Sequence, residues 1–384
     1  MQVQRWVLLV VAVLVWAIPT LGADSADAAR SDAVAPAADP RTDATSDSAK
    51  REASREDDGE ESSPEAEAEA KAEKKEAAVD AEAEDATSSD DSGKRAAPAG
   101  ADLLVVAKGR GATTSVTDTS ELERALAAAR PGDTIRMAAG TYEPVVISRS
   151  GTASAPITLI GPEGAVITGS GKGYTVHLDG ASHWQLVGFA VSGGGKGIMT
   201  DGSTGLLLDS LTVSDTGDEA VHFRGGSSNN TIQRSTIRNT GLSQPEFGEG
   251  VYVGSAKSNW KTYSGGKPDL SMNNRVVGNT FQRITAENVD VKEETGGTLI
   301  AGNRFDGSAI SGENFADSVV DVKGYDSTVT GNVTTGNAPA LKNIIETHVI
   351  TEPETSGCGN RIANNRVEGF RPAGELVAVD KKCE

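Results

Sequence analysis

The run Arg275-Val276-Val277-Gly278-Asn279 recurs one repeat later as Leu299-Ile300-Ala301-Gly302-Asn303, and an aromatic residue, Phe281 or Phe305, follows each copy. Short aliphatic runs that end in glycine and asparagine predict short β-strands joined by tight turns. Where no insertion intervenes, the runs recur at a spacing in the low twenties of residues, which is typical of a parallel solenoid. Further copies of the run lie at 184–187, 205–208, 231–232, 327–329 and 360–362.

The Gly-Asn pairs have a structural explanation. Gly331-Asn332 repeats the pair that ends in Asn279 and Asn303, and Asn364-Asn365 is a variant of it. Buried polar groups at equivalent turns need hydrogen-bond partners, and stacked asparagine side chains can bond one another from coil to coil. We therefore expect the asparagine column to hold the solenoid together.

The folded domain is expected to occupy residues 101–384. Ser120-Glu121-Leu122-Glu123 has the form of a helix capping box, and Leu122 and Leu126 suit the buried face of a short helix. Pro131-Gly132-Asp133 ends this helix, and only short β-branched runs and turns follow. The sequence therefore predicts an all-β solenoid with a short N-terminal capping helix.

The first hundred residues are expected to lie outside this domain. Residues 1–23 have the features of a signal peptide: Arg5, an apolar run over 6–18, and small residues before the end. The run is shorter than the roughly 20 apolar residues that a spanning helix needs, although an uncleaved anchor is the alternative. Residues 24–100 contain no Leu, Ile, Phe, Tyr or Trp and are rich in Ala, Glu, Asp and Ser, which predicts a disordered acidic linker.

These segments and the overall charge indicate where the protein acts and which partners it can have. Much of the net charge of −19 comes from the acidic linker, so the charge says little about a substrate. No other stretch is long and apolar enough to cross a membrane. We expect a secreted, extracellular monomer with no stable membrane association after signal cleavage and no nucleic-acid partner.

The chain has two cysteines, Cys358 and Cys383, both near its C-terminus. In an oxidising compartment a single disulfide that closes this end is the expected arrangement. A metal-binding pair and a free reactive thiol are the alternatives, but neither cysteine has supporting His or Cys neighbours.

The N-terminal half carries a family resemblance. Pro131-Gly132-Asp133-Thr134-Ile135, Gly140-Thr141-Tyr142, 151–159 and 184–189 resemble the opening of the pectate-lyase-like β-helix superfamily. The resemblance implies a right-handed parallel β-helix from about residue 101 to the end. Members include uronate lyases, hydrolases, epimerases and phage-type adhesins, so it implies a fold and leaves the reaction to the site.

The second half is similar to uncharacterised secreted right-handed β-helix repeat proteins of actinobacteria. The similarity is carried by Glu249-Gly250-Val251-Tyr252-Val253-Gly254-Ser255 and by 316–324, and it implies no activity. The Trp-Ile-Asp-His and Gly-His-Gly runs of characterised pectate lyases and galacturonidases are absent.

Six strand segments share a further pattern, in which the first and third residues are mostly apolar. Because alternate side chains of a strand face opposite ways, these residues are expected to point into the coil and the second and fourth outward. The six segments are 198–201, 221–224, 251–254, 289–292, 320–323 and 345–348. The second column reads Met199, His222, Tyr252, Asp290, Asp321 and Glu346, and the fourth reads Asp201, Arg224, Gly254, Lys292, Lys323 and His348.

Stacked coils place equivalent residues about 4.8 Å apart, so an acidic column is expected beside a basic one on the surface. Glu219, Glu249 and Glu287 precede three of the strands and add carboxylates at the rim. Exposed ion pairs of this kind are common and contribute little to stability, which is the plain explanation. Because His222 and Tyr252 join the charges, we favour a functional strip.

An insertion, Lys257-Ser258-Asn259-Trp260-Lys261-Thr262-Tyr263-Ser264-Gly265-Gly266-Lys267, breaks the repeat directly after one of these strands. It should fold over the strip. Trp260 and Tyr263 could stack on sugar rings, while Lys257, Lys261 and Lys267 could hold carboxylates or sulfates. The alternative is a loop that packs on itself as a small core of its own.

The strip suits a polysaccharide lyase acting on an acidic, uronate-containing polymer by β-elimination. Lys292 is the expected base, because Lys323 and Arg224 beside it should lower its pKa. Arg224 or Lys323 would clamp the uronate carboxylate, and Tyr252 or His222 would protonate the leaving oxygen. His348 ends the same basic column.

Three carboxylates of the strip suggest a cofactor. Asp290, Asp321 and Glu346 offer oxygen ligands for Ca²⁺, the candidate metal.

Two other functions are considered. A non-catalytic β-helix that binds acidic cell-wall or matrix glycan through the same strip is the alternative to the lyase. Glycoside hydrolysis is disfavoured, because acids packed among lysines stay ionised and cannot serve as the general acid.

Overall fold

The computed structural model describes residues 102–350 and 356–383. The predicted signal peptide over 1–23 and the acidic linker over 24–100 lie outside these residues. None of the helices in the described part of the chain is long and apolar enough to span a membrane.

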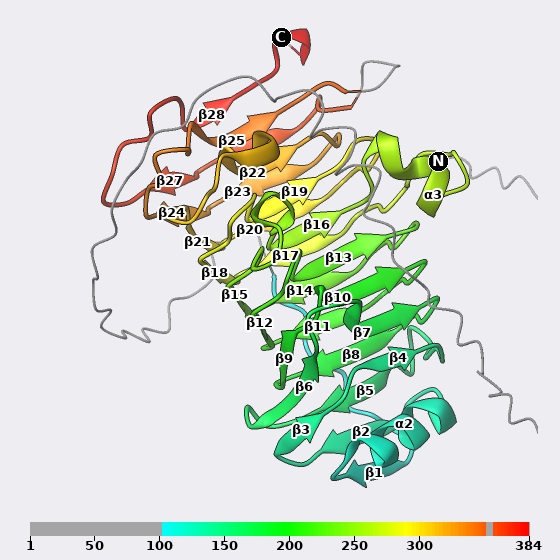
Figure 1. Cartoon of the computed structure of the whole chain (residues 1–384). Helices are drawn as coiled ribbons and strands as arrows, with labels where there is room; N and C mark the ends of the chain where they lie inside the picture. Colours follow the sequence, from blue (N-terminus) through cyan, green and yellow to red (C-terminus); the bar gives the residue numbers. More distant parts are fainter. Residues whose placement is uncertain (1–101, 351–355, 384) are drawn as a thin grey trace, which may run out of the picture. The chain divides into compact units, whose positions relative to one another are not determined.

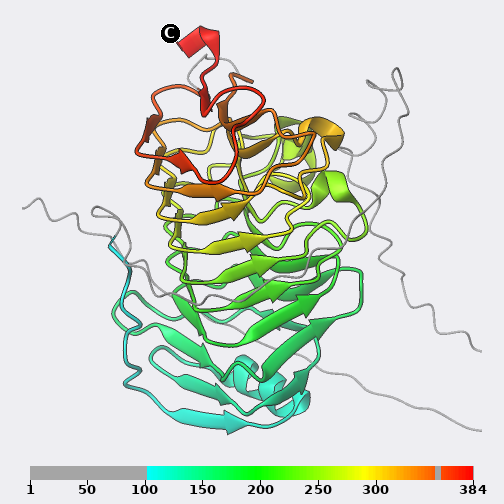
Figure 2. The same cartoon turned by 90° about the vertical axis from the view of Figure 1, so that its left-hand side faces the viewer.

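The described chain winds into coils that build three parallel sheets (Figures 1 and 2). We call them sheets A, B and C, in the order in which the chain enters them. Sheet A contains β1 (Thr113–Val116), β2 (Thr134–Met137), β5 (Ile157–Ile160), β8 (Trp184–Val187), β11 (Leu207–Asp209), β14 (Thr231–Gln233), β17 (Arg275–Val277), β20 (Leu299–Ala301), β23 (Thr328–Thr330) and β26 (Arg361–Ala363). Sheet B contains β3 (Gly140–Tyr142), β6 (Ala165–Gly169), β9 (Ala190–Gly193), β12 (Thr212–Ser214), β15 (Thr236–Arg238), β18 (Thr280–Gln282), β21 (Arg304–Asp306), β24 (Val333–Thr335) and β27 (Arg366–Val367). Sheet C contains β4 (Val145–Ile147), β7 (Tyr174–Asp179), β10 (Lys196–Asp201), β13 (Val221–Arg224), β16 (Val251–Val253), β19 (Val289–Val291), β22 (Ser318–Val322), β25 (Asn343–Thr347) and β28 (Val377–Ala378). From β2 onward each coil contributes one strand to each sheet, whereas β1 is followed by a helix.

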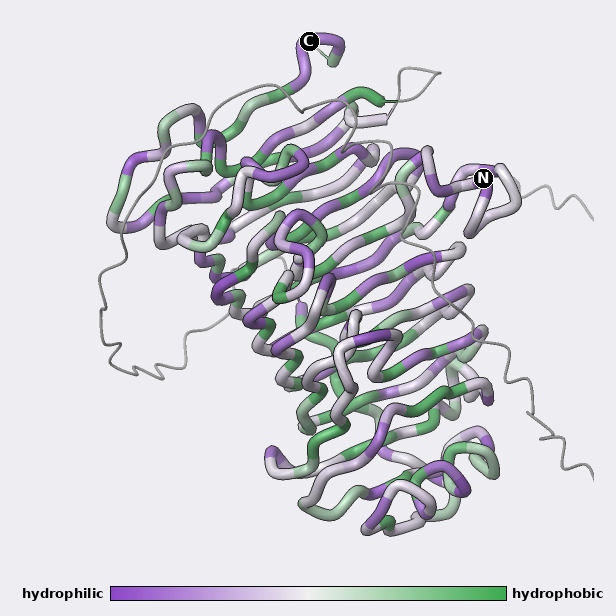
Figure 3. Tube along the Cα trace, viewed as in Figure 1, coloured by the Kyte–Doolittle hydropathy of each residue, from purple (hydrophilic) through white to green (hydrophobic). Residues whose placement is uncertain are grey.

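This arrangement is a right-handed parallel β-helix, and it confirms the predicted fold class. Apolar and polar residues alternate along the coils, and the apolar ones recur at matching positions in successive coils (Figure 3). The inward side chains form one continuous core cluster. Within it, Phe281 and Phe305 stack with their ring centroids 5.0 Å apart. Burial of these stacked inner faces is the main force that stabilises the solenoid.

The asparagine column is structural, as predicted. Oδ1 of Asn303 accepts hydrogen bonds from the backbone N–H and the side-chain amide of Asn279, at 2.9 and 3.1 Å. Asn332 does the same for Asn303, at 2.9 and 3.0 Å, and Asn365 does so for Asn332. Each side chain thereby satisfies buried polar groups of the neighbouring coil.

The predicted helix is α2 (Thr119–Ala128), and it covers the N-terminal end of the core with Leu122 and Leu126. Its N-cap, however, is Asp118 and not Ser120, because a carboxylate oxygen of Asp118 accepts from the backbone N–H of Glu121 at 2.9 Å. Other helical turns are η1 (Pro245–Phe247), η2 (Lys257–Asn259), α3 (Trp260–Tyr263), η3 (Glu313–Phe315) and η4 (Lys381–Cys383).

The segment 102–110 runs across the outer face of sheet A. The side-chain amide of Gln233 bonds both the N–H and the C=O of Leu104, each at 2.8 Å. Gln185 bonds both backbone groups of Ala107 in the same way, at 2.6 and 2.9 Å. These strands are two coils apart, and three extended residues of the segment span this distance.

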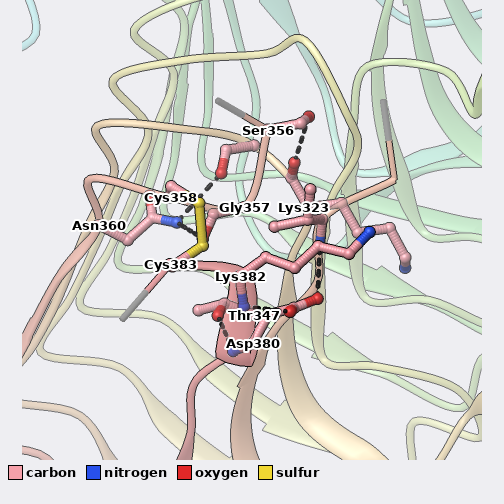
Figure 4. The surroundings of a disulfide bond; sticks show 11 residues. Lys323, Thr347, Ser356, Gly357, Cys358, Asn360, Asp380, Lys382 and Cys383 are labelled. Carbon is pink, nitrogen blue, oxygen red and sulfur yellow. Dashed lines mark hydrogen bonds between the residues drawn. A yellow bond between two sulfur atoms is a disulfide. The ribbon is translucent and has the colours of Figure 1, made fainter. Parts of the chain in front are cut away.

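The C-terminal end is held by the disulfide between Cys358 and Cys383, whose Cα atoms lie 5.3 Å apart (Figure 4). Nearby, the backbone N–H of Asp380 donates to the hydroxyl of Thr347 at 3.0 Å. A carboxylate oxygen of Asp380 accepts from the N–H of Val349 at 2.9 Å. The last residues therefore pack against the end of β25, next to His348.

Candidate functional site

The strand alignment that the sequence predicted for the strip is confirmed, because it matches the register of sheet C. His222 pairs with Tyr252, and Tyr252 pairs with Asp290. Asp290 pairs with Asp321, and Asp321 pairs with Glu346. The apolar positions of these strands lie in the core, as expected; among them are Val289, Val291, Val320 and Val322. We use "strip" for the outward side chains of this sheet.

The strip begins one strand earlier than predicted. His177 of β7 pairs with Met199, and Asp179 pairs with Asp201. The sequence could have revealed this strand, because Val176-His177-Leu178-Asp179 alternates apolar and polar residues like the other segments.

Most of the outward-facing side chains of the strip are buried, whereas the sequence placed its charged columns on the surface. Asp290 is 1% exposed and Tyr252 is 4% exposed. Glu219, Glu249 and Glu287, expected at the rim, are buried as well. Buried charges must be compensated, so each ion pair matters more than it would on an open surface.

The half of the strip toward the C-terminus is a chain of ion pairs. Asp290 lies between Lys292 and Lys323, with nitrogen–oxygen distances of 2.9 and 3.4 Å. Asp321 lies between Lys323 at 2.6 Å and Nδ1 of His348 at 2.9 Å. Nε2 of His348 is 3.5 Å from Glu346.

Asp321, Lys323 and His348 keep their charges at neutral pH. Burial alone would raise the pKa of Asp321, but the charge of Lys323 and the hydrogen bond with His348 hold that pKa well below its usual range. The charges of Asp290 and Asp321 outweigh burial and raise the pKa of Lys323. The hydrogen bond with Asp321 raises the pKa of His348 to about 9, so His348 is a cation at neutral pH.

These pairs correct the predicted metal site. Asp290, Asp321 and Glu346 do not converge on one point, because Lys323 lies between the first two and His348 lies between the last two. The carboxylates that do converge are Glu249, Glu287 and Asp290, whose ligand oxygens lie within 4.8 Å of one another.

This acidic triad could hold a metal ion. Oε2 of Glu249 is buried and has no hydrogen-bond partner. Burial, followed by the charges of Glu219 and Glu287, raises the pKa of Glu249 well above its ordinary value. Burial and the charge of Asp290 raise the pKa of Glu287 to about 8. Burial and mutual repulsion therefore favour the protonated carboxyls or a bound cation at this site. The sequence did not reveal it, because the Glu positions precede the aligned strands.

Arg224 does not lie beside Lys292, as the sequence suggested, because Gly254 stands between them in the column. Its guanidinium binds both carboxylate oxygens of Asp201, at 2.8 and 3.0 Å. It also lies 4.0 Å from the ring centroid of Tyr263. Arg224 is therefore committed to Asp201 and to the inserted loop, and it is not available as a carboxylate clamp.

The inserted loop folds back over the strip through Tyr263. Trp260 is only 9% exposed, and its indole N–H donates to the carbonyl of Ser255 at 2.9 Å. Trp260 therefore packs inside the loop, and the prediction that it stacks on sugar is wrong. The buried carboxylate of Asp269 fixes the returning end, since it accepts from the N–H groups of Gly225 and Gly226, each at 2.9 Å. The loop lysines, Lys257, Lys261 and Lys267, are exposed.

Tyr252 lies between two neighbours from adjacent coils. Its ring centroid is 4.3 Å from that of His222, with the rings at 67°. Nζ of Lys292 lies 4.9 Å from the same centroid on the other side. The predicted base and one predicted acid are thus neighbours.

No protein-family profile and no curated protein matches the chain. Among solved structures, an alginate lyase from Paenibacillus sp. str. FPU-7 is 37% identical, with a TM-score of 0.66 over 70% of this chain and 91% of that one. A rhamnogalacturonan lyase is 14% identical, with a TM-score of 0.50 over 71% and 86% of the two chains. A lacto-N-biosidase from Eubacterium ramulus is 12% identical, with a TM-score of 0.51 over 67% and 56%. The rhamnogalacturonan lyase and the lacto-N-biosidase share only their fold with this chain.

Proposed function

The chain belongs to the pectate-lyase-like right-handed parallel β-helix superfamily, in the same family as the Paenibacillus alginate lyase, and from this premise we propose that it is a polysaccharide lyase. It would cleave a uronate-containing polymer by β-elimination, with alginate as the first substrate to test. The observation that supports this most directly is the placement of Lys292 against Tyr252, with Lys323 and His348 in the same column.

β-Elimination needs three groups. A base removes the proton from C5 of the uronate, the C5–H electrons form the C4–C5 double bond, and the bond from C4 to the bridging oxygen breaks. An acid then gives that oxygen a proton, while a cation neutralises the uronate carboxylate and so stabilises the charge that develops at C5.

We assign Lys292, acting in its neutral form after it has given up the proton it carries at rest, as the base and Tyr252 as the acid. Lys323 is bound to two carboxylates, Asp290 at 3.4 Å and Asp321 at 2.6 Å. Lys323 therefore remains an ammonium group and suits the carboxylate clamp. His348, a cation at neutral pH, extends the clamp toward the C-terminus.

The substrate class follows from the cations. The polymer would lie over the part of the strip between Tyr252 and His348, because Tyr263 covers Arg224 at the other end. The exposed lysines of the inserted loop, Lys257, Lys261 and Lys267, would extend the contact with an acidic chain beyond the reacting residue. These groups attract carboxylates despite the acidic balance of the whole protein.

Glu249, Glu287 and Asp290 fit a hard divalent cation, since they supply several buried carboxylate oxygens and one of these has no protein partner. We propose that they are the residues that would hold Ca²⁺. A bound ion would supply positive charge beside the strip.

We also propose that the protein acts outside the cell. The signal-peptide features of residues 1–23 and the disulfide between Cys358 and Cys383 support this proposal.

The test is a panel of acidic polysaccharides, alginate included, incubated with wild type, Tyr252→Phe and Lys342→Ala. Lys342 pairs with Asp317 and is exposed, so it serves as the control for loss of a surface charge. Wild type and Lys342→Ala should release products that absorb as unsaturated uronates, and Tyr252→Phe should release far fewer. Binding of a polymer without any unsaturated product would instead identify a non-catalytic glycan-binding protein.

The metal proposal is tested by dialysis against a chelator. Wild type should bind Ca²⁺ in calorimetry, and Glu249→Gln should bind it far more weakly. Failure of the wild-type protein to take up Ca²⁺ would contradict the assignment.

A further inference from the structure

The two ring nitrogens of His222 have different surroundings, and neither is exposed to solvent. Nε2 lies 2.7 Å from the carbonyl oxygen of Gly254. Nδ1 lies 3.2 Å from Oε1 of Glu219, an ion-pair distance without hydrogen-bond geometry. The residue is buried, and both nitrogens face oxygens of the protein. This burial argues against His222 as the acid that protonates the leaving oxygen, a role for which the sequence offered Tyr252 or His222.

Glu219 is itself fixed in place. Nζ of Lys196 lies 2.7 Å from its Oε2 and 3.3 Å from Asp218. Burial alone would raise the pKa of Glu219, but the charge of Lys196 and the contact with His222 hold it well below its ordinary value. Lys196, Glu219 and His222 therefore form a connected chain of charged and polar groups that ends at Tyr252.

The end of this chain determines where Tyr252 lies. The His222 ring packs edge-on against Tyr252, with a centroid distance of 4.3 Å. The same imidazole binds the carbonyl of Gly254, two residues after Tyr252, where the backbone turns with a φ of 86°. His222 thus contacts both the ring of Tyr252 and the backbone that carries it.

We propose that Glu219 and His222 are a positioning pair for Tyr252. They hold the phenol where it can protonate the leaving oxygen, without touching the substrate themselves. This inference rests on the proposed lyase function. Misplacement of a reacting group by about 1 Å can slow a reaction about 100-fold, so such a pair would act on turnover more than on substrate binding.

The chain offers a matched control. His177 lies in the same column, 2.9 Å from a carboxylate oxygen of Asp201, with its ring 5.0 Å from that of Tyr174 at 66°. This histidine has the same kind of acid and tyrosine neighbours as His222, but it lies away from Lys292 and Tyr252. His177→Phe should therefore reproduce any general effect of replacing a strip histidine.

The first experiment compares kcat and KM for His222→Phe, Glu219→Gln and His177→Phe on the polymer that wild type cleaves. His222→Phe should lower kcat about 10- to 100-fold with KM nearly unchanged. His222→Gln, which keeps a donor for Gly254, should recover part of the loss and serves if the Phe variant does not fold. His177→Phe should match wild type. A His222→Phe enzyme with unchanged kcat would overturn the proposal.

A second measurement does not depend on activity. The NMR signal of Tyr252, from isotope-labelled tyrosine and assigned by its loss in Tyr252→Phe, should shift in His222→Phe and Glu219→Gln. It should stay in place in His177→Phe, where the signal of Tyr174 should shift instead. If cleavage falls while the Tyr252 signal is unmoved, His222 acts on the substrate directly and the positioning role is wrong. If wild type cleaves no polymer, the lyase proposal fails, and the NMR result still decides whether the pair positions Tyr252.

Discussion

Asp290→Asn should destabilise the protein far more than an ordinary surface substitution. Asp290 is 1% exposed and lies 2.9 Å from Lys292 and 3.4 Å from Lys323. Asparagine keeps the shape of the side chain but removes the charge between two ammonium groups. Both lysines would then remain in a buried strip with one carboxylate fewer.

The magnitude follows from what each lysine retains. Lys323 keeps Asp321 at 2.6 Å, so most of its compensation survives. Lys292 loses a carboxylate at 2.9 Å while it is itself buried. Removal of one partner of a buried pair costs about 3–5 kcal/mol. Because Lys323 keeps its pair with Asp321, we expect a cost at the lower end of this range, about 3 kcal/mol in the free energy of unfolding.

The assay is urea unfolding at neutral pH, with chelator present so that metal binding does not contribute. Asp317→Asn is the control, since Asp317 pairs at 2.6 Å with Lys342, whose side chain is 70% exposed. This control should cost no more than about 1 kcal/mol. Adding Lys292→Met to Asp290→Asn should recover part of the loss, because it removes one of the two positive charges that Asp290 compensates. Equal effects of Asp290→Asn and Asp317→Asn would show that water compensates the strip, and the reasoning would fail.

Three further predictions address the column, the pH response and the C-terminus. Asn303→Ala should lower stability by at least about 2 kcal/mol in urea unfolding, because the buried N–H of Asn279 loses its acceptor; an unchanged midpoint would argue against a structural column. His348 is charged below its pKa of about 9, so affinity for an acidic polymer should fall as the pH rises through this value in wild type. His348→Ala should lack this fall, and a parallel fall in both proteins would exclude His348 as its source. Reduction of the disulfide between Cys358 and Cys383 should speed hydrogen exchange in β26, β27 and β28 and leave the middle coils unchanged, because a solenoid couples only neighbours; uniform acceleration would contradict this.

The fold and the strand register could be predicted because they depend on local periodicity. The repeated Gly-Asn turns locate the coils. The alternation of apolar and polar residues around Asp290 and Asp321 determines which side chains of these strands point outward. A shift of one residue would have turned Val289 and Val320 outward, so the pattern allowed only one alignment.

The site was only partly predictable, because its contacts cross between coils and loops. The sequence placed Arg224 near Lys292, but it could not show that Asp201 and Tyr263 occupy the guanidinium. It left Trp260 open between two roles that depend on how the loop folds.

The acidic triad was missed for the same reason. Glu249 and Glu287 stand outside the aligned strands, and only the turn of the chain brings them next to Asp290.

The most direct test of the lyase assignment is the structure of the product formed from alginate by wild type and by Lys292→Ala. NMR of the wild-type digest should show a new sugar end with a C4–C5 double bond, formed in step with the rise in ultraviolet absorbance. Lys292→Ala should form none of it and still bind the polymer, because the base acts only in the transition state. Cleavage by Lys292→Ala at the wild-type rate would contradict the assignment of the base. Wild-type products with saturated ends would contradict β-elimination itself.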